Sequence, residues 1–183
     1  MSNEVKQIEL DDALASVDTM LMLHGHFPHY LNIAAKTYEW QAYLYSENEK
    51  IYRQSHLQAL KYYQRSAALR MHWPITWVFM ASVKSKLNQL DKDFYFYLEQ
   101  AIQYGPYAHE VNLEVSKLQL LHWGNLPGLA TKSGLEQIKR ALVNNQSRLA
   151  LLNYARDIKR IELVCTVAKL NKIKAASQYH LCR

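Results

Sequence analysis

The most constraining feature of this sequence is a recurrence of helix-starting positions at two-helix spacings. Pro28, Pro74 and Ala108 each open a stretch with helical periodicity, at steps of 46 and 34 residues. A large apolar side chain follows three residues later, and a small or β-branched one follows seven residues later. Proline suits such starts because the N–H groups of the first helical turn have no partner within the helix. The recurrence predicts a series of similar helix hairpins.

Low glycine and proline content supports the same fold class. The chain has 5 Gly and 4 Pro in 183 residues, fewer than a turn-rich all-β protein or a doubly wound α/β enzyme normally needs. The step of 34 residues is the length of a tetratricopeptide repeat, and residues 50–106 resemble such a repeat up to the Gly105-Pro106 stop. We predict an all-α fold: a right-handed stack of antiparallel helix hairpins, similar to tetratricopeptide repeats.

The predicted repeats make up a single helical-repeat domain over residues 1–183. Its core repeats cover about 8–145, C-terminal capping helices cover about 147–175, and a short tail closes the chain at 176–183. The step of 46 residues fits a repeat with a 12-residue insertion, which we place around residues 43–52. Ordinary α-hairpin packing outside the repeat family stays open as the alternative.

Small residues mark the expected helix crossings. Where two helices cross closely, the contact point needs a short side chain, and large side chains fill the space beside it. Ala35, Ala59, Ala81 and Ala101 are the expected contact points. The large residues expected to fill the space between neighbouring hairpins are Tyr38, Tyr63 and Trp77.

Stacked hairpins would line a concave groove with the first helix of each repeat. Counted from the three helix starts, the second, fifth, ninth and twelfth positions point into this groove. Asn and Lys side chains there can hold a peptide backbone or a C-terminal carboxylate. A solvated face without an occupant stays open as the alternative. The predicted partner-binding residues are His29, Asn32, Lys36, Glu39, Ser82, His109, Asn112, Ser116 and Gln119, with Lys86 alongside them.

Four phrases of the sequence carry a closer resemblance: HFPHYLNIAAKTYEWQA (26–42), YYQRSAALRMHWPITW (62–77), KLNQLDKDFYFYLEQAIQYGP (86–106) and ELVCTVAKL (162–170). They resemble the VpsP-type exopolysaccharide-biosynthesis proteins of marine gamma-proteobacteria. The resemblance implies a helical-repeat scaffold that binds protein partners of a polysaccharide assembly or export system. Family members typically begin with a hydrophobic anchor, which this chain lacks, and the resemblance assigns no catalytic residue.

Charge is distributed unevenly along the chain. The formal net charge is +6, yet residues 1–50 carry 3 basic and 8 acidic side chains, whereas residues 151–183 carry 7 basic and 2 acidic ones. Such asymmetry suits head-to-tail contacts, acidic partners or an anionic polymer. Nucleic-acid binding is therefore the second hypothesis, with RDIKR (156–160) and KLNKIK (169–174) as its basic stretches. The acidic first third and the lack of a reading motif count against it, and we expect no nucleic acid as partner.

The sequence lacks the motifs that nucleophilic, zinc-dependent and nucleotide-binding enzymes share. Asp11, Asp12, Asp91 and Asp93 are expected at helix starts, where they cap N–H groups. Glu39, Glu110 and Glu114 could face one groove, but nothing marks them as a catalytic pair. We expect no catalytic residue and no enzyme. A carbohydrate-acting enzyme is the third and weakest hypothesis.

The histidine cluster HGHFPH (24–29) spans a helix end and a turn without a neighbouring Cys or Asp, so we expect no metal site and no cofactor. Aromatic rings next to basic residues could stack on bases or sugars, although packing is the simpler role for them. The surface candidates are Tyr43, Tyr45, Tyr52, Tyr95 and Tyr107.

Cys165 and Cys182 are the two cysteines, either two inert thiols or one disulfide in an oxidising compartment. The chain as given has no signal peptide and no membrane-spanning stretch, so we expect it to be soluble. The resemblance implies a periplasmic or inner-membrane-associated location, with membrane contact only through the anchor that this chain lacks. A cytoplasmic location stays open.

Overall fold

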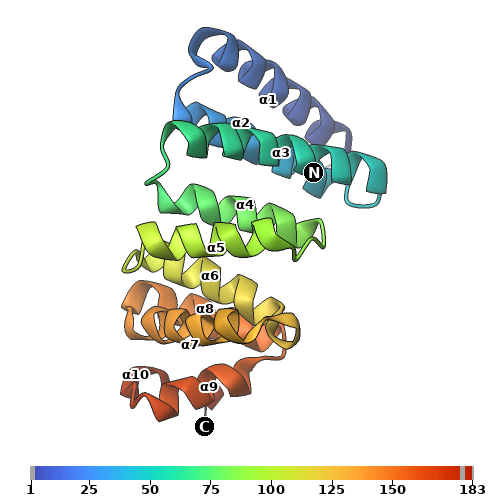
Figure 1. The fold of residues 1–183 in the computed structure, drawn as a ribbon. Helices are drawn as coiled ribbons and strands as arrows, with labels where there is room; N and C mark the ends of the chain where they lie inside the picture. The colour runs from blue at the N-terminus through green and yellow to red at the C-terminus, as the bar shows by residue number, and fades with distance from the viewer. Residues whose placement is uncertain (1–2, 178–179, 183) are drawn as a thin grey trace. The chain divides into compact units, whose positions relative to one another are not determined.

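The computed structural model of the chain is built from α-helices joined by short turns (Figure 1). It describes residues 3–177 and 180–182. Within these ranges there are α-helices and two 3₁₀ turns but no β-strand. The predicted all-α class is confirmed. The finer prediction, a right-handed stack like that of tetratricopeptide repeats, stays a prediction.

The chain divides into two compact units, Met1–Tyr97 and Leu98–Arg183. The prediction of one domain over residues 1–183 stays a prediction. The boundary falls inside one helix, α5 (Lys92–Tyr104), which ends directly before the predicted Gly105-Pro106 stop.

In the first unit, α2 and α3 form the central hairpin, α1 packs on α2, and α4 packs on α3. The hairpin is long because α2 has 17 residues and α3 has 21, whereas α4 and α5 have 13 each. The extra residues of the longer step therefore lengthen the two helices on either side of a short turn. The helices are α1 (Asn3–His24), α2 (Pro28–Leu44), α3 (Glu49–Leu69) and α4 (Pro74–Lys86).

Local chemistry explains where these helices begin. Pro28 and Pro74 occupy the first turn of α2 and α4, as the sequence predicts. The Asp91 carboxylate accepts hydrogen bonds from the backbone N–H groups of Asp93 and Phe94, at 3.1 and 3.2 Å, and so caps α5.

The other acidic pair has a different position from the one predicted. Asp11 and Asp12 lie in the interior of α1, since that helix already begins at Asn3. The prediction that they cap a helix start is wrong. Both carboxylates are exposed on the helix surface.

The core of the first unit combines small and large side chains. Ala35, Ala59 and Ala81 are fully buried, as expected for helix crossings. Tyr63 and Trp77 are buried beside them, whereas Tyr38 is half-buried. A Cβ methyl at these points lets the helix backbones approach closely, while the rings fill the spaces that such crossings leave.

The second unit packs α6 against α7 and α8, and packs α9 against α7 and α8. Its core is aliphatic and includes Leu120, Ile138, Leu142, Leu151 and Val164. The predicted capping helices over about 147–175 are interrupted after α9, at Asn171. The remaining elements are α6 (His109–Leu121), η1 (Trp123–Asn125), α7 (Gly128–Val143), α8 (Asn145–Asp157), α9 (Ile161–Leu170), α10 (Lys174–Ser177) and η2 (His180–Cys182).

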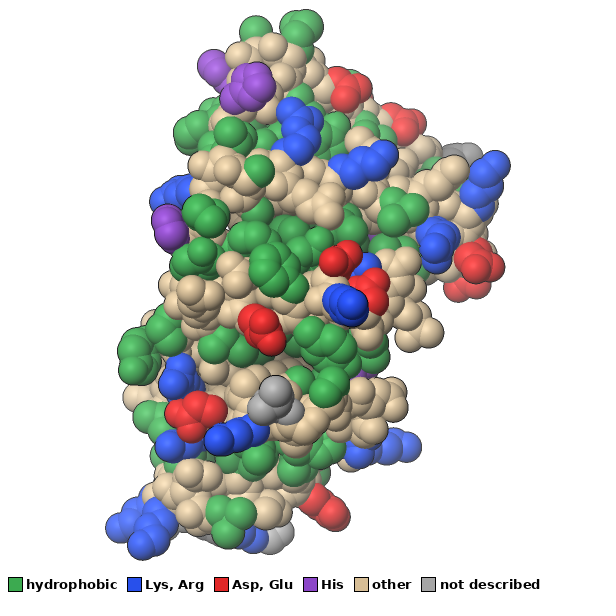
Figure 2. Space-filling model, viewed as in Figure 1, with side chains coloured by type: hydrophobic (Ala, Val, Ile, Leu, Met, Phe, Trp, Pro, Cys, Tyr) green, Lys and Arg blue, Asp and Glu red, His purple; other side chains and the backbone are tan. Residues whose placement is uncertain are grey.

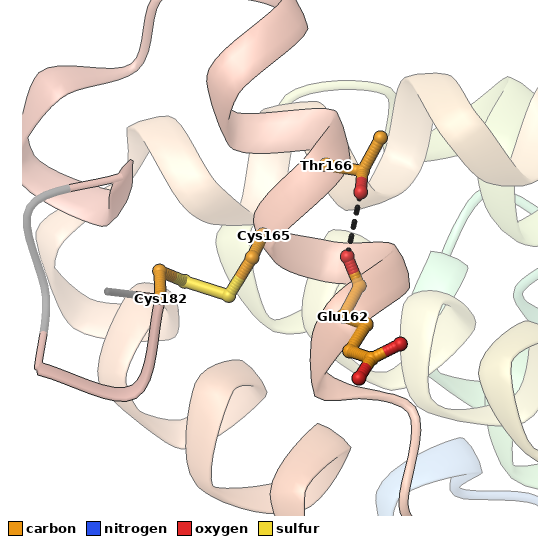
Figure 3. The surroundings of a disulfide bond; sticks show 4 residues. All are labelled: Glu162, Cys165, Thr166 and Cys182. Atoms are coloured by element: carbon orange, nitrogen blue, oxygen red, sulfur yellow. Dashed lines mark hydrogen bonds between the residues drawn. A yellow bond between two sulfur atoms is a disulfide. The ribbon is translucent and has the colours of Figure 1, made fainter.

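A disulfide joins Cys165 of α9 to Cys182 of η2, with a Cα–Cα distance of 5.2 Å (Figure 3). The structure thus favours the bridged alternative of the two that the sequence left open. Both cysteines are buried, and the bridge fastens the end of the chain to α9.

Among the described residues, we find no helix that combines the length and the apolar character needed to cross a membrane.

Candidate binding pocket

The predicted groove positions of α2 lie against α4 and the turn before it. The Asn32 amide is buried and donates a hydrogen bond to the Thr76 hydroxyl at 2.9 Å. The Glu39 carboxylate forms an ion pair with the Lys86 ammonium at the other end of this contact between α2 and α4, which we call the seam. Two predicted groove residues therefore bind each other across α2 and α4.

Two exposed positions complete this seam. The His29 ring stacks on Trp73 with ring centroids 6.1 Å apart, and the Lys36 ammonium lies 4.5 Å from the centre of the Phe79 ring. Ser82 is half-buried on α4. The exposed side chains of the seam thus have aromatic neighbours, so they form a surface that is already packed.

Glu39 also belongs to a polar network inside the first unit. The Tyr63 hydroxyl donates to the Glu39 carboxylate at 2.7 Å, and burial together with this negative neighbour raises the pKa of Tyr63 above its usual range. Burial, assisted by the Lys86 charge, lowers the pKa of His56 to about 4, although Glu39 acts in the opposite direction. The network satisfies the Glu39 charge internally.

In the second unit, two of the predicted groove residues lie inside the helix packing. The Ser116 hydroxyl donates to the backbone carbonyl of Asn112 at 2.6 Å within α6. The Gln119 amide donates to the backbone carbonyl of Ala130 at 3.2 Å, which ties α6 to α7. Both side chains are buried, so they are not part of an open surface. His109 is half-buried, 3.8 Å from Glu110.

Asn112 has a different environment, because it lines a pocket of about 480 Å³. The pocket is formed by the turn before α6, by α6 itself, by the last turn of α7 and by the start of α8. Its lining residues are Tyr107, Asn112, Lys139, Arg140, Val143, Asn144 and Asn145.

One wall of the pocket is basic. The Arg140 guanidinium donates to the Pro106 carbonyl at 2.7 Å and lies 5.1 Å from the centre of the Tyr107 ring. Arg140 and Lys139 share a single carboxylate, Glu136, at 3.2 and 3.5 Å. Two cations with one anion leave a positive excess at this wall.

The second polar feature of the pocket is the Asn112 side chain. It is only 4% exposed, and its carbonyl oxygen, Oδ1, accepts no hydrogen bond from any residue that the structure describes. A buried acceptor without a donor lowers the free energy of unfolding by about 1–3 kcal/mol. This oxygen is closed to solvent, so a ligand would recover that cost by donating to it once the Asn112 side chain turns toward the pocket.

The start of α8 adds to the positive character of the pocket. The Asn144 side chain caps the helix by accepting from the backbone N–H groups of Gln146 and Ser147, at 2.8 and 3.3 Å. The positive end of the α8 dipole therefore lies beside the basic wall. Val143, exposed next to it, supplies an apolar surface.

The groove pattern in the sequence identified Asn112 but missed Lys139, Arg140, Val143 and Asn144. These residues lie on the second helix of a hairpin and in the turn after it, whereas the pattern followed first helices only. Tyr107 was singled out only as a surface aromatic, and it is indeed exposed at the pocket mouth. The run KRALVNN (139–145), with cations and amides around an apolar centre, is the signal that could have shown this wall.

The described side chains contain no group of three or more His, Cys, Asp or Glu residues placed to hold a metal ion. The chain matches no protein-family model, and it shows no significant similarity to a curated protein or to a solved structure.

Proposed function

We propose that this protein is a non-catalytic helical scaffold that binds partner proteins, and that the pocket around Asn112 holds an extended segment of such a partner. The observation that carries the proposal is the buried Asn112 Oδ1 without a donor, beside the two cations Lys139 and Arg140. This combination calls for a ligand with an N–H donor and a negative charge close together.

The C-terminal residue of a polypeptide has all the groups that the pocket could satisfy. Its backbone N–H can donate to Asn112, and its carboxylate can pair with Lys139 and Arg140. Its side chain can pack on the exposed ring of Tyr107 and on Val143. Of these groups, only the Asn112 oxygen lacks a partner among the described residues, while Lys139 and Arg140 share one carboxylate and so can accept a second anion.

The proposed setting is extracellular polysaccharide biosynthesis or export. This part of the proposal rests on the resemblance of the four sequence phrases to VpsP-type proteins. The disulfide between Cys165 and Cys182 supports it, since such bonds persist in oxidising compartments such as the bacterial periplasm. A periplasmic or inner-membrane-associated location is therefore part of the same proposal.

Nucleic-acid binding remains the second candidate function because of the net charge of +6 and the exposed basic residues Lys159, Arg160, Lys169 and Lys172. Its physical signature is affinity that falls steeply with salt. The same assay can distinguish the two functions.

The experiment is a fluorescence-anisotropy titration of the full chain with a labelled peptide library, each sequence made with a free and with an amidated C-terminus. We expect free C-termini to bind more tightly. Asn112→Ala should weaken binding about fivefold, as loss of one hydrogen bond does, and Lys139→Glu should weaken it more. Lys132→Glu, an equal charge change at an exposed site on α7, is the matched control.

Two results would overturn the proposal. One is equal binding of free and amidated peptides with no effect of the pocket variants. The other is salt-sensitive binding of single-stranded or duplex nucleic acid by a protein that binds no peptide.

A further inference from the structure

The first unit ends in a helix with one side uncovered. α1 packs on α2 through Leu10 and Val17, which are buried. Away from this contact, Ile8, Met22 and Leu23 are exposed, and Met22 is 79% exposed. The solvent-facing side of a surface helix is normally polar. Large apolar side chains on this side of α1 fit a contact with another surface.

The uncovered side of α1 carries a shallow, open hollow with one carboxylate. It is bordered by Asp12, Ala15, Ser16, Thr19, Met20 and Leu23. The short side chains at 15, 16 and 19 leave room for an incoming side chain between the two ends of the hollow. Among the side chains of α1 that the structure describes, the exposed carboxylates are those of Glu9, Asp11, Asp12 and Asp18, and Figure 2 shows red side chains along this helix.

The second unit carries the complementary features at the end of α9. Leu170 is the last residue of α9 and is 77% exposed. The exposed Lys169 precedes it, and the exposed Lys172 follows at the turn, where its φ of 55° ends the helix. Figure 2 shows blue side chains beside both ends of α9. The disulfide at Cys165 fastens this helix to the end of the chain.

We propose that the protein assembles head to tail with further copies of itself: Leu170 of one copy enters the α1 hollow of the next. Lys169 and Lys172 then face Asp12 across the contact. Charge complementarity selects a second copy as the occupant, since residues 1–50 carry 3 basic and 8 acidic side chains and residues 151–183 carry 7 and 2. Because the two surfaces differ, the contact is heterologous and builds rows or closed rings.

Sedimentation velocity of the full chain over a range of concentrations tests this assembly. The mean mass should rise beyond that of a dimer at low salt and fall at high salt. Leu170→Asp should raise the dissociation constant at least about tenfold, the usual loss when a buried leucine is removed from a contact. Leu149→Asp, at an exposed leucine of α8, should leave the mass unchanged.

A charge swap identifies the two surfaces. Asp12→Lys and Lys169→Glu should each weaken assembly, and the two changes in one chain should restore it. Circular dichroism should be unchanged throughout, because both positions are exposed. A monomer at every concentration, assembly that tolerates Leu170→Asp, or a double variant that stays weak would each overturn the proposal.

Discussion

His56 makes the stability of the first unit depend on pH in a defined direction. The ring is 2% exposed, its Nδ1 has no hydrogen-bond partner among the described residues, and it packs edge-on against Tyr52 with centroids 4.5 Å apart. Burial, and then the nearby Lys86 charge, lowers its pKa to about 4 from an ordinary value of 6.5. The native protein thus holds this ring neutral.

The direction of this pH dependence follows from the linkage between proton binding and folding. Between pH 6.5 and about 4, the unfolded chain binds a proton at His56 that the folded chain does not. The stability that comes from the neutral ring is therefore fully present above pH 6.5 and is lost as the pH falls toward 4. One pKa unit corresponds to 1.36 kcal/mol, so the shift amounts to about 3 kcal/mol of the free energy of unfolding.

Urea unfolding, followed by circular dichroism at about pH 7 and about pH 4, measures this loss. Carboxylates titrate over the same range, so the comparison with His56→Gln isolates the histidine. We expect the wild type to lose about 3 kcal/mol more than the variant on acidification. His26→Gln, at an exposed histidine, is the matched control and should behave as the wild type.

Nuclear magnetic resonance titration of the imidazole gives the pKa of His56 directly. A value near 6.5, or an equal loss of stability in wild type and His56→Gln, would refute the reasoning from burial.

Three further predictions concern the fold. Ala81→Trp should overpack the fully buried site on α4, costing about 1–3 kcal/mol or more, and an unchanged thermal midpoint would contradict this. Reducing the Cys165–Cys182 bridge, which closes a loop over a sequence separation of 17, should cost about 3 kcal/mol of thermal stability. A double alanine variant at the cysteines should show no response to reductant. Asp91→Ala should cost about 1 kcal/mol more in urea than Asp91→Asn, because Asn also caps helices; equal losses would refute the cap.

Helix boundaries could be predicted where the chain carries backbone-specific residues. Pro28 and Pro74 start helices because their missing N–H groups are no loss there, and α5 ends at Gly105-Pro106. The predicted helix start at Asp11 and Asp12 was wrong, because the sequence alone does not distinguish a carboxylate in a helix interior from one at a helix cap. The Asp91 carboxylate, by contrast, accepts from N–H groups of the first turn of α5.

The pocket was harder to predict because its parts come from different helices. Periodicity placed Asn112 on one side of α6, but the cations come from α7, about 27 residues later. For the same reason, periodicity did not show that the predicted groove residue Asn32 is buried against Thr76, which lies 44 residues away in the sequence. Periodicity gives the side of a helix on which a residue lies, whereas the partner follows from tertiary packing.

The central claim, that the Asn112 pocket holds partner proteins, is tested most directly by affinity purification from the source cell. The tagged natural full-length protein would be compared with Asn112→Ala/Lys139→Glu and with Lys132→Glu, and the bound material identified by mass spectrometry. We predict that wild type and Lys132→Glu recover components of polysaccharide assembly or export, and that the folded double variant does not. Equal recovery by all three proteins, or recovery only of nucleic acid that salt removes, would contradict the account.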